Sequence, residues 1–152
     1  MTAPRQVARA DHAPAFRWPV RIYWEDTDAA GIVFYANYLR FFERARTEWL
    51  RSLGFEQERL RASAGHGFVV TDTSLHYRAP ARLDDTLEVT VRVGHVGLAS
   101  MTVAQQARRA GELVAEGTIR VGCIDLGTFR PRRIPEDILA RIRDDERQQA
   151  TR

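Results

Sequence analysis

Three carboxylates crowd into one short segment, Trp24-Glu25-Asp26-Thr27-Asp28-Ala29-Ala30-Gly31. The segment stands shortly before an amphipathic pattern that starts at Asn37, and acids near the start of a helix are favourable on charge alone. However, the acids lie too far from Asn37 to cap the helix directly, and the intervening residues 31–35 are apolar and are predicted to be buried. A carboxylate beside buried apolar chain is unusual. Such a group can act as a nucleophile or as a general base, so this segment is the leading candidate for chemistry, with a helix cap as the structural alternative.

The same segment does not predict a metal site. Its Asp-x-Asp spacing imitates the opening of a calcium-binding loop, but Ala30 stands at the fifth position and Asn37 at the twelfth, where an oxygen ligand and a bidentate Glu are needed. The histidines at positions 66, 76 and 95 have no paired ligand spacing. We therefore expect no bound metal.

Composition excludes several other chemistries. All 23 basic residues are arginine, so the chain has no lysine for a Schiff base or for a P-loop. The 20 acids are interspersed with the arginines and the net charge is +3, so the chain lacks the basic stripe that nucleic-acid binding requires. We predict no nucleic-acid partner.

The length of 152 residues fits one domain. We expect a domain over residues 16–143, between flexible tails at 1–15 and 144–152. The single cysteine, Cys123, lies on the apolar face of a predicted strand and fits a reducing compartment. No segment approaches the roughly 18 apolar residues of a membrane span, and the N-terminus lacks the apolar core of a signal peptide. These features predict a cytoplasmic protein with no integral membrane segment.

Hydrophobic periodicity predicts the elements that must position the acids. Apolar residues recur near the helical period from Asn37 to Leu53, which predicts a long amphipathic helix ended by Gly54, and a shorter helix is predicted over 56–64. Alternation predicts four strands in a meander-like antiparallel sheet, over residues 69–77, 87–93, 99–109 and 113–123. A strand over 16–23 and a helix over about 135–143 complete an α+β domain in which a sheet wraps around one long central helix.

Several motifs follow one another along the chain. They are Glu25-Asp26-Thr27-Asp28 with Gly31-Ile32-Val33-Phe34-Tyr35-Ala36-Asn37-Tyr38, then Phe42-Glu43-Arg44-Ala45-Arg46-Thr47-Glu48, then Tyr77-Arg78-Ala79-Pro80 with Arg82-Leu83-Asp84-Asp85, and finally Arg130-Pro131-Arg132. Together they resemble the hotdog-fold acyl-CoA thioesterases, most closely the Tol-Pal-associated (YbgC-type) branch, with 4-hydroxybenzoyl-CoA thioesterase as a more distant relative. The resemblance covers nearly the whole domain. It implies a hotdog fold, in which an antiparallel sheet surrounds the long helix, and this agrees with the periodicity.

The resemblance implies that Asp28 is the catalytic carboxylate and that a backbone N–H at Tyr35 polarises the thioester carbonyl. The start of a helix carries free N–H groups and a partial positive charge, which suit the oxyanion that develops on thioester attack. Asp28 would either attack the carbonyl, giving a mixed anhydride, or take a proton from water. The residues alone leave both routes open.

The resemblance also implies substrate contacts at Tyr35, Glu43 and Arg82. Many members of the YbgC-type branch have histidine at the Tyr35 position, whereas the hydroxybenzoyl branch has tyrosine. Glu43 matches an acid that contacts substrate in the aromatic-acyl branch, and its structural alternative is an exposed partner for a neighbouring arginine. Arg82 is either a contact for a coenzyme A phosphate or part of a loop salt bridge with the acids that follow it.

The implied activity is hydrolysis of an acyl-CoA thioester, or of an acyl carrier protein thioester, to a free acid and a thiol. Coenzyme A is then part of the substrate, so no cofactor is expected. Hotdog subunits generally join their sheets, which implies a homodimer or a homotetramer. The alternative is a non-catalytic module that binds acyl-CoA or an acyl carrier, or an interaction module of lipid or envelope metabolism.

Overall fold

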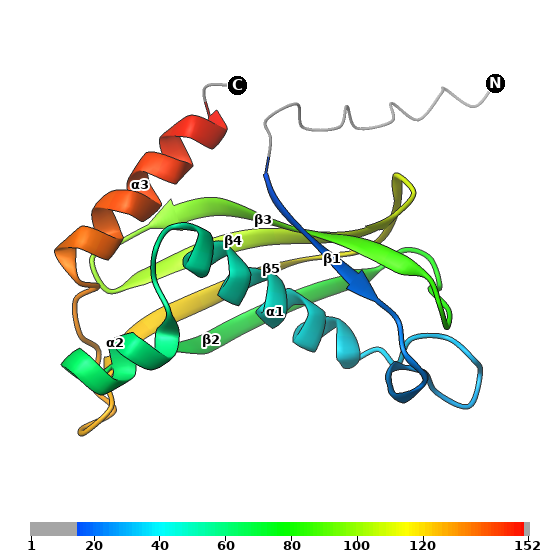
Figure 1. Ribbon diagram of the computed structural model, residues 1–152, viewed down its shortest axis with the longest axis horizontal. Coiled ribbons are helices and arrows are strands. Elements are labelled where there is room, and N and C mark those ends of the chain that lie inside the picture. Colours follow the sequence, from blue (N-terminus) through cyan, green and yellow to red (C-terminus); the bar gives the residue numbers. More distant parts are fainter. Residues whose placement is uncertain (1–14, 151–152) are drawn as a thin grey trace.

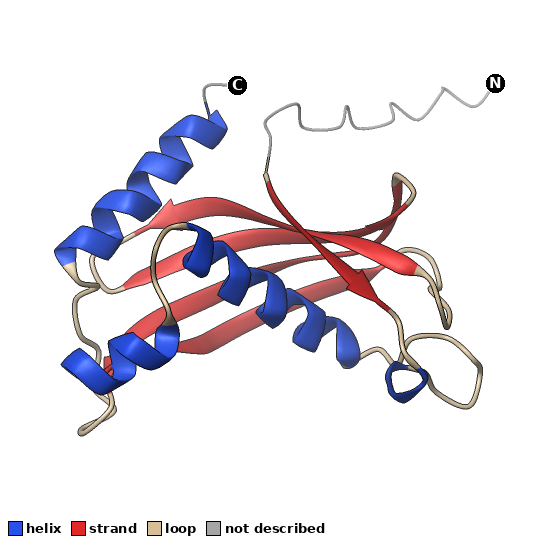
Figure 2. Cartoon of the chain, in the orientation of Figure 1, coloured by secondary structure: helices blue, strands red, loops and turns tan. Residues whose placement is uncertain are grey.

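The computed structural model describes residues 15–150, and most of the expected N-terminal tail lies outside this range. The elements in chain order are β1 (Phe16–Arg21), the short 3-10 helix η1 (Trp24–Asp26), α1 (Asn37–Ser52), α2 (Gln57–Ala64), β2 (His66–Tyr77), β3 (Thr86–Val96), β4 (Ser100–Arg109), β5 (Glu112–Asp125) and α3 (Glu136–Ala150). Helix α1 lies across one antiparallel sheet of five strands (Figures 1 and 2). The predicted α+β architecture is confirmed.

Helix α1 forms where the periodicity predicts it. Its sheet-facing positions carry large apolar side chains that are almost fully buried, namely Tyr38, Phe41, Phe42, Ala45, Trp49 and Leu50. Burying one large apolar side chain stabilises a fold by about 1.5–3 kcal/mol, so packing against the sheet holds this helix in place. The helix ends at Ser52, and Gly54 turns the chain with a φ of 94°, a conformation that glycine adopts without steric cost.

The order of the strands differs from the predicted meander. Across the sheet the order is β1-β3-β4-β5-β2, so β2 pairs with β5 at the far edge and does not lie beside β3. The place beside β3 belongs to β1, where Phe16 faces Val91 and Arg21 faces Thr86. The periodicity of a strand shows which of its faces is buried but not which strand lies beside it, so the prediction that β2 neighbours β3 is wrong.

Helix α3 extends past the predicted domain boundary at residue 143. It continues to Ala150, and the side chain of Gln149 is buried, where its Oε1 accepts a hydrogen bond of 3.0 Å from the Val93 N–H of β3. The structure therefore places residues 144–150, which we expected to form a flexible tail, in a helix that contacts the sheet. No helix of residues 15–150 is both long enough and apolar enough to cross a membrane.

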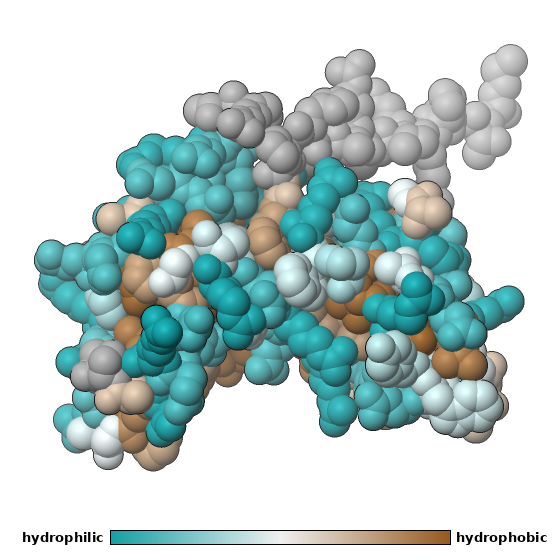
Figure 3. Space-filling model, in the orientation of Figure 1, coloured by the Kyte–Doolittle hydropathy of each residue, from teal (hydrophilic) through white to brown (hydrophobic). Residues whose placement is uncertain are grey.

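Strand β2 forms an edge of the sheet, and most of its side chains are exposed, including Val69, Val70 and Tyr77. The outer backbone groups of an edge strand are a template for pairing with another strand. In the space-filling view, hydrophilic side chains cover most of the visible face, apolar atoms show between them, and the lower outline is hollowed (Figure 3). The outer backbone groups of β2 therefore have no partner strand among the described residues.

Candidate active site

The loop after β1 is tied to the start of α1 by Asp26. This carboxylate is buried, and its two oxygens accept hydrogen bonds from the Tyr23 N–H at 2.8 Å and from the Asn37 side-chain amide at 2.9 Å. The Asp26 carbonyl in turn accepts a hydrogen bond of 2.8 Å from the Phe34 N–H. Of the three acids in the loop, Asp26 therefore has the structural role that a helix-cap interpretation predicts, although it bonds the Asn37 side chain rather than the helix backbone.

Asp28 lies in a tight turn at the exposed end of the same loop. Its N–H donates to the Ile32 carbonyl at 2.9 Å, its carbonyl accepts from the Gly31 N–H at 2.9 Å, and Gly31 has a φ of 78°. The Asp28 Oδ1 accepts a hydrogen bond of 2.9 Å from the Ala30 N–H. No described residue donates to Oδ2. One carboxylate oxygen thus stays available on a turn that fixes the direction of the side chain.

Residues 31–35, between the acids and the helix, were predicted to be buried, but most of them are not. Val33 is buried and its N–H donates to the Ala81 carbonyl, but Phe34 and Tyr35 are 41% and 63% exposed. Their apolar character therefore marks an exposed aromatic surface next to Asp28. Sequence periodicity cannot separate such a surface from core, because both are apolar.

The start of α1 presents two unused hydrogen-bond donors. The Asn37 N–H donates to the Phe34 carbonyl at 2.8 Å, whereas the N–H groups of Tyr35 and Ala36 donate to no acceptor within the described part of the chain. Free N–H groups at a helix start favour a negative charge. This position can therefore stabilise an oxyanion.

Tyr77 of β2 fixes this helix start, a role that the sequence did not predict. Its hydroxyl donates a hydrogen bond of 3.1 Å to the Tyr35 carbonyl, and its ring meets the rings of Tyr35 and Tyr38 with centroids 6.4 and 5.7 Å apart. Burial raises the pKa of the Tyr77 hydroxyl and raises the pKa of Tyr38 to about 12. Both hydroxyls therefore stay protonated near neutral pH.

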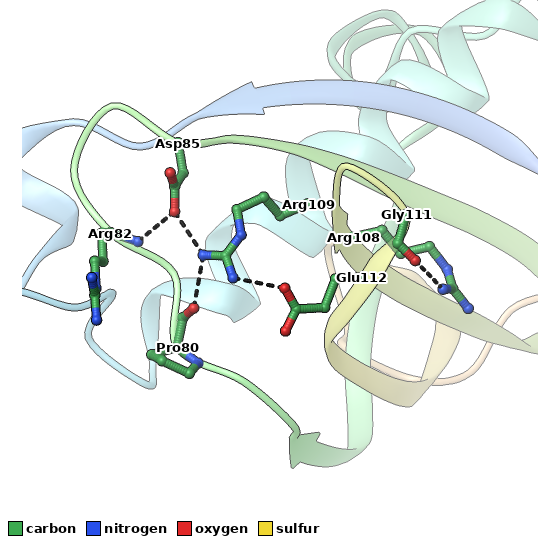
Figure 4. A network of polar contacts seen from close by, with 7 residues as sticks. All are labelled: Pro80, Arg82, Asp85, Arg108, Arg109, Gly111 and Glu112. Carbon is green, nitrogen blue, oxygen red and sulfur yellow. Dashed lines mark hydrogen bonds and ion pairs between the residues drawn. The ribbon is translucent and has the colours of Figure 1, made fainter. Parts of the chain in front are cut away.

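Arg82 lies beside the Asp28 turn, in the loop between β2 and β3. It forms an isolated antiparallel bridge with Ile32, and its N–H donates to Asp85 Oδ2 at 2.9 Å. Its guanidinium makes no bond to any residue of the described chain and points away from Asp85 (Figure 4). The alternative of a side-chain salt bridge from Arg82 to the acids that follow it is thus not realised, and the guanidinium is available to a ligand.

The ion pair of this loop comes from Arg109, at the end of β4 (Figure 4). Its guanidinium donates to Asp85 Oδ2 at 2.8 Å, to the Pro80 carbonyl at 2.9 Å and to Glu112 at 2.9 Å. The hydrogen bond from Arg109 is the main reason why the pKa of Asp85 is lowered, and the Arg82 N–H contributes next. Arg109 therefore holds the loop that pairs with the Asp28 turn.

Glu43 lies apart from these groups. It follows Tyr35 by eight residues, which at a rise of about 1.5 Å per residue places it about 12 Å along α1. It is exposed, makes no ion pair with a neighbouring arginine, and borders a cavity of about 210 Å³ between α1, α2 and the sheet. The cavity is also lined by Arg46, Trp49, Leu50, Phe68 and Met101. The structure thus brings Asp28, Tyr35 and Arg82 to one end of α1 and places Glu43 at a cavity farther along it.

Two further side chains are buried. Cys123 is 1% exposed in the core, as predicted, and burial raises the pKa of its thiol. His66 is the first residue of β2 and is 7% exposed. Among residues 15–150, no three His, Cys, Asp or Glu side chains group closely enough to hold a metal ion.

Comparison with known proteins identifies the family. The sequence matches the thioesterase-like superfamily over residues 22–142. It is 42% identical over 125 residues to the acyl-CoA thioesterase YbgC of Haemophilus influenzae, an alignment that spans 82% of this chain and 92% of that protein. It is 43% identical over 129 residues to the acyl-CoA thioester hydrolase YbgC of Escherichia coli, spanning 84% of this chain and 96% of that protein.

A solved structure gives the same result for the fold. The crystal structure of a hypothetical protein from Thermus thermophilus superimposes with a TM-score of 0.80 at 30% identity, over 85% of this chain and 98% of that one. The sequence resemblance to hotdog thioesterases is therefore confirmed by both comparisons. The chain belongs to the thioesterase-like superfamily, within its YbgC branch.

Proposed function

We propose that this protein hydrolyses acyl-CoA thioesters, with Asp28 as the catalytic carboxylate and the Tyr35 N–H as a donor to the thioester oxygen. The observation that carries the proposal is the pairing of a carboxylate with a free oxygen and a helix start with free N–H groups on one short stretch of chain. The two segments that bear them pair through the Thr27–Val33 bridge. The YbgC relatives, named as acyl-CoA thioesterases, support the same reaction.

The chemistry follows from these groups. An N–H at the start of α1 stabilises the negative charge that develops on the thioester oxygen, and the helix dipole adds to this effect. Asp28 then either attacks the carbonyl to give a mixed anhydride or takes a proton from the attacking water. Hydroxylamine separates the two routes, because its attack on the aspartyl carbonyl of a mixed anhydride leaves a hydroxamate on the Asp28 side chain and releases the free acid, whereas the general-base route leaves Asp28 unmodified.

The substrate contacts are proposed at three residues. Arg82 has an unengaged guanidinium beside the Asp28 turn, which suits a phosphate of coenzyme A or of a carrier-bound thioester. Tyr35 offers an exposed ring at the reaction centre, and Glu43 borders the cavity into which the acyl group extends. Neutralising Arg82 as Arg82→Gln should raise KM for acyl-CoA and leave kcat nearly unchanged.

We also propose that the protein acts as a homodimer or as a homotetramer made of two such dimers. The support is the edge strand β2, whose outer backbone groups pair with no described strand and whose apolar side chains are exposed. A second copy of β2 would satisfy these groups and continue the sheet. Light scattering should report a dimer or tetramer, and a monomer at micromolar concentration would contradict this part of the proposal.

Thiol release from a panel of acyl-CoA substrates tests the reaction. Asp28→Asn should lower kcat by at least about a hundredfold, the scale on which positioned acid–base groups act. Glu25→Gln is the matched control, because Glu25 is an exposed acid of the same loop that bonds no other side chain within residues 15–150, and this variant should keep the wild-type rate. Wild-type protein that binds acyl-CoA but releases no thiol would instead indicate a non-catalytic binding module.

A further inference from the structure

Arg46 is a cation at the wall of the cavity beside α1, and the nearest acid of that cavity, Glu43, acts on it through its charge without forming a salt bridge. Arg46 is half-buried, and it forms no ion pair with any acid in the described part of the chain. Its one recorded hydrogen bond runs from Nη1 to Gln105 Oε1 at 2.8 Å. A guanidinium has five N–H donors, and those of Arg46 that do not bond Gln105 are open to solvent, because no Arg46 nitrogen is among the buried polar atoms of the described residues that lack a partner. This side chain therefore has capacity for a ligand that accepts hydrogen bonds.

Gln105 holds Arg46 in place. It is a polar residue on the apolar face of β4 and is 1% exposed. Its Nε2 donates to the Phe42 carbonyl of α1 at 3.0 Å and to the Thr90 carbonyl of β3 at 3.3 Å, so its Oε1 is left to accept from Arg46. A buried glutamine with every group engaged fixes the position of its partner. Arg46 is thus a prepositioned donor and not a loose surface side chain.

The remaining surroundings of Arg46 are mostly apolar. Trp49, Leu50, Phe68 and Met101 line the same cavity of about 210 Å³. Burial lowers the pKa of the guanidinium, and the charge of Glu43 opposes this shift. A mostly apolar cavity with an oriented cation in its wall and an exposed acid, Glu43, beside it suits a chain that is apolar along its length and anionic at its end.

The cavity lies within reach of the reaction centre. Arg46 follows Ala36 by ten residues, about 15 Å along the helix axis. Helical side chains lean toward the N-terminus, which brings the guanidinium closer to the helix start than its Cα. An acyl chain of medium length, held by its thioester at the start of α1, would run along the helix to this cavity.

We propose that Arg46, positioned by Gln105, determines acyl specificity, and that the cavity accepts acyl chains that end in a carboxylate. The inference rests on the proposed thioesterase function and deepens it by naming the class of acyl group. Glu43 lines the same cavity but is exposed, whereas Arg46 is half-buried. Glu43 therefore weakens the preference for an anionic end and does not abolish it.

Two thioesters that differ only at the chain end test this proposal. Thiol release is measured with octanoyl-CoA and with its ω-carboxy analogue, suberoyl-CoA. Wild-type protein should favour suberoyl-CoA in kcat/KM, and Arg46→Gln should reduce that preference by about tenfold, mainly through KM. Arg46→Lys keeps the charge but not the planar donors, so its preference for suberoyl-CoA should lie between those of the wild-type protein and Arg46→Gln. Glu43→Gln should increase the preference.

The matched control is Arg40→Gln, which removes the same charge from α1 but not from this cavity, and it should leave the preference unchanged. The proposal is overturned if wild-type protein hydrolyses octanoyl-CoA at least as well as suberoyl-CoA, or if Arg46→Gln keeps the wild-type ratio. Should Arg46→Gln fail to fold, the ratio of kcat/KM for suberoyl-CoA and octanoyl-CoA, measured for the wild-type protein and for Arg46→Lys, still tests the proposal. Absence of thiol release from both substrates and from the rest of the panel would instead remove the proposed function.

Discussion

The two ends of helix α1 are built differently. At the C-terminal end, two hydrogen bonds connect this region to α3. Trp49 Nε1 donates to Asp145 of α3 at 2.8 Å, and Arg141 of α3 donates to the Leu53 carbonyl at 2.6 Å. These contacts join the C-terminal end of α1 to α3. We call this the closed end.

The start of α1 is left open. The N–H groups of Tyr35 and Ala36 have no acceptor among residues 15–150, Asp28 keeps a free carboxylate oxygen, and the ring of Tyr35 is exposed. A fold that satisfies the polar groups at one end of a helix and leaves donors free at the other has capacity for a ligand at the open end. The comparison predicts that mutations at the closed end affect stability, whereas mutations at the open end affect chemistry.

Trp49→Ala is expected to have the largest effect and to act on stability. The side chain is 1% exposed, so its removal leaves a cavity and should lower the free energy of unfolding by about 3–5 kcal/mol in urea denaturation. Trp24→Ala is the control, because Trp24 is 80% exposed and its loss should cost less than about 0.5 kcal/mol. Equal losses for the two variants would contradict the description of the closed end.

Tyr35→Pro tests the open end through the backbone. Proline removes an N–H that no described residue accepts, so the melting temperature should change little while kcat falls by about a hundredfold or more. Tyr35→Ala and Tyr35→His keep the N–H and change only the ring, so they should alter KM and keep kcat near its wild-type value. If Tyr35→Ala lost as much kcat as Tyr35→Pro, the ring and not the N–H would be the group that acts.

Asp26→Asn separates structure from chemistry within one loop. Asp26 is buried and accepts two hydrogen bonds, one of them from Asn37, so loss of its charge should lower the free energy of unfolding by about 1.5–3 kcal/mol. Asp28 is exposed, and Asp28→Asn should leave stability nearly unchanged. Chemical denaturation of both variants checks this, and a larger stability loss for Asp28→Asn would reverse the assigned roles.

The elements were predictable from sequence, because each leaves a local signal. The helical period from Asn37 and the alternation through Leu87, Val89 and Val91 follow from one buried face on each element, and these residues are buried as expected. The position of β2 and the length of α3 were not predictable, because they depend on contacts between distant segments. The bond from the Val93 N–H to Gln149 is such a contact.

The residues of the candidate site also fall into those that the sequence could predict and those that it could not. Asp28, Tyr35 and Arg82 are proposed as site residues because the motifs around them resemble a known family. Tyr77 and Arg109 carried no local signal for their roles, since their partners are 42 and 24 residues away in the chain. The exposed positions of Phe34 and Tyr35 were missed because an apolar segment at a site has the same composition as one in the core.

Arg109→Ala should have the smallest effect of these variants. The lowered pKa of Asp85 means that its ionised form stabilises the fold above its ordinary pKa, and that this contribution is lost as the pH falls through the lowered value. Arg109→Ala should therefore lower the melting temperature by a few degrees at neutral pH. As the pH is lowered, the melting temperature of this variant should fall less than that of the wild-type protein. Arg108→Ala is the control, since among residues 15–150 Arg108 bonds only Gln106 and the Gly111 carbonyl, and this variant should keep the wild-type pH profile.

The kcat of Asp28→Asn on the best acyl-CoA substrate of the wild-type protein tests the central claim most directly. The measurement uses preparations whose melting temperatures match, so that a loss of rate reports chemistry at the open end. The account predicts a fall of at least about a hundredfold with stability retained. A variant that hydrolyses the thioester at the wild-type rate would contradict the assignment of Asp28 and, with it, the role of the open end.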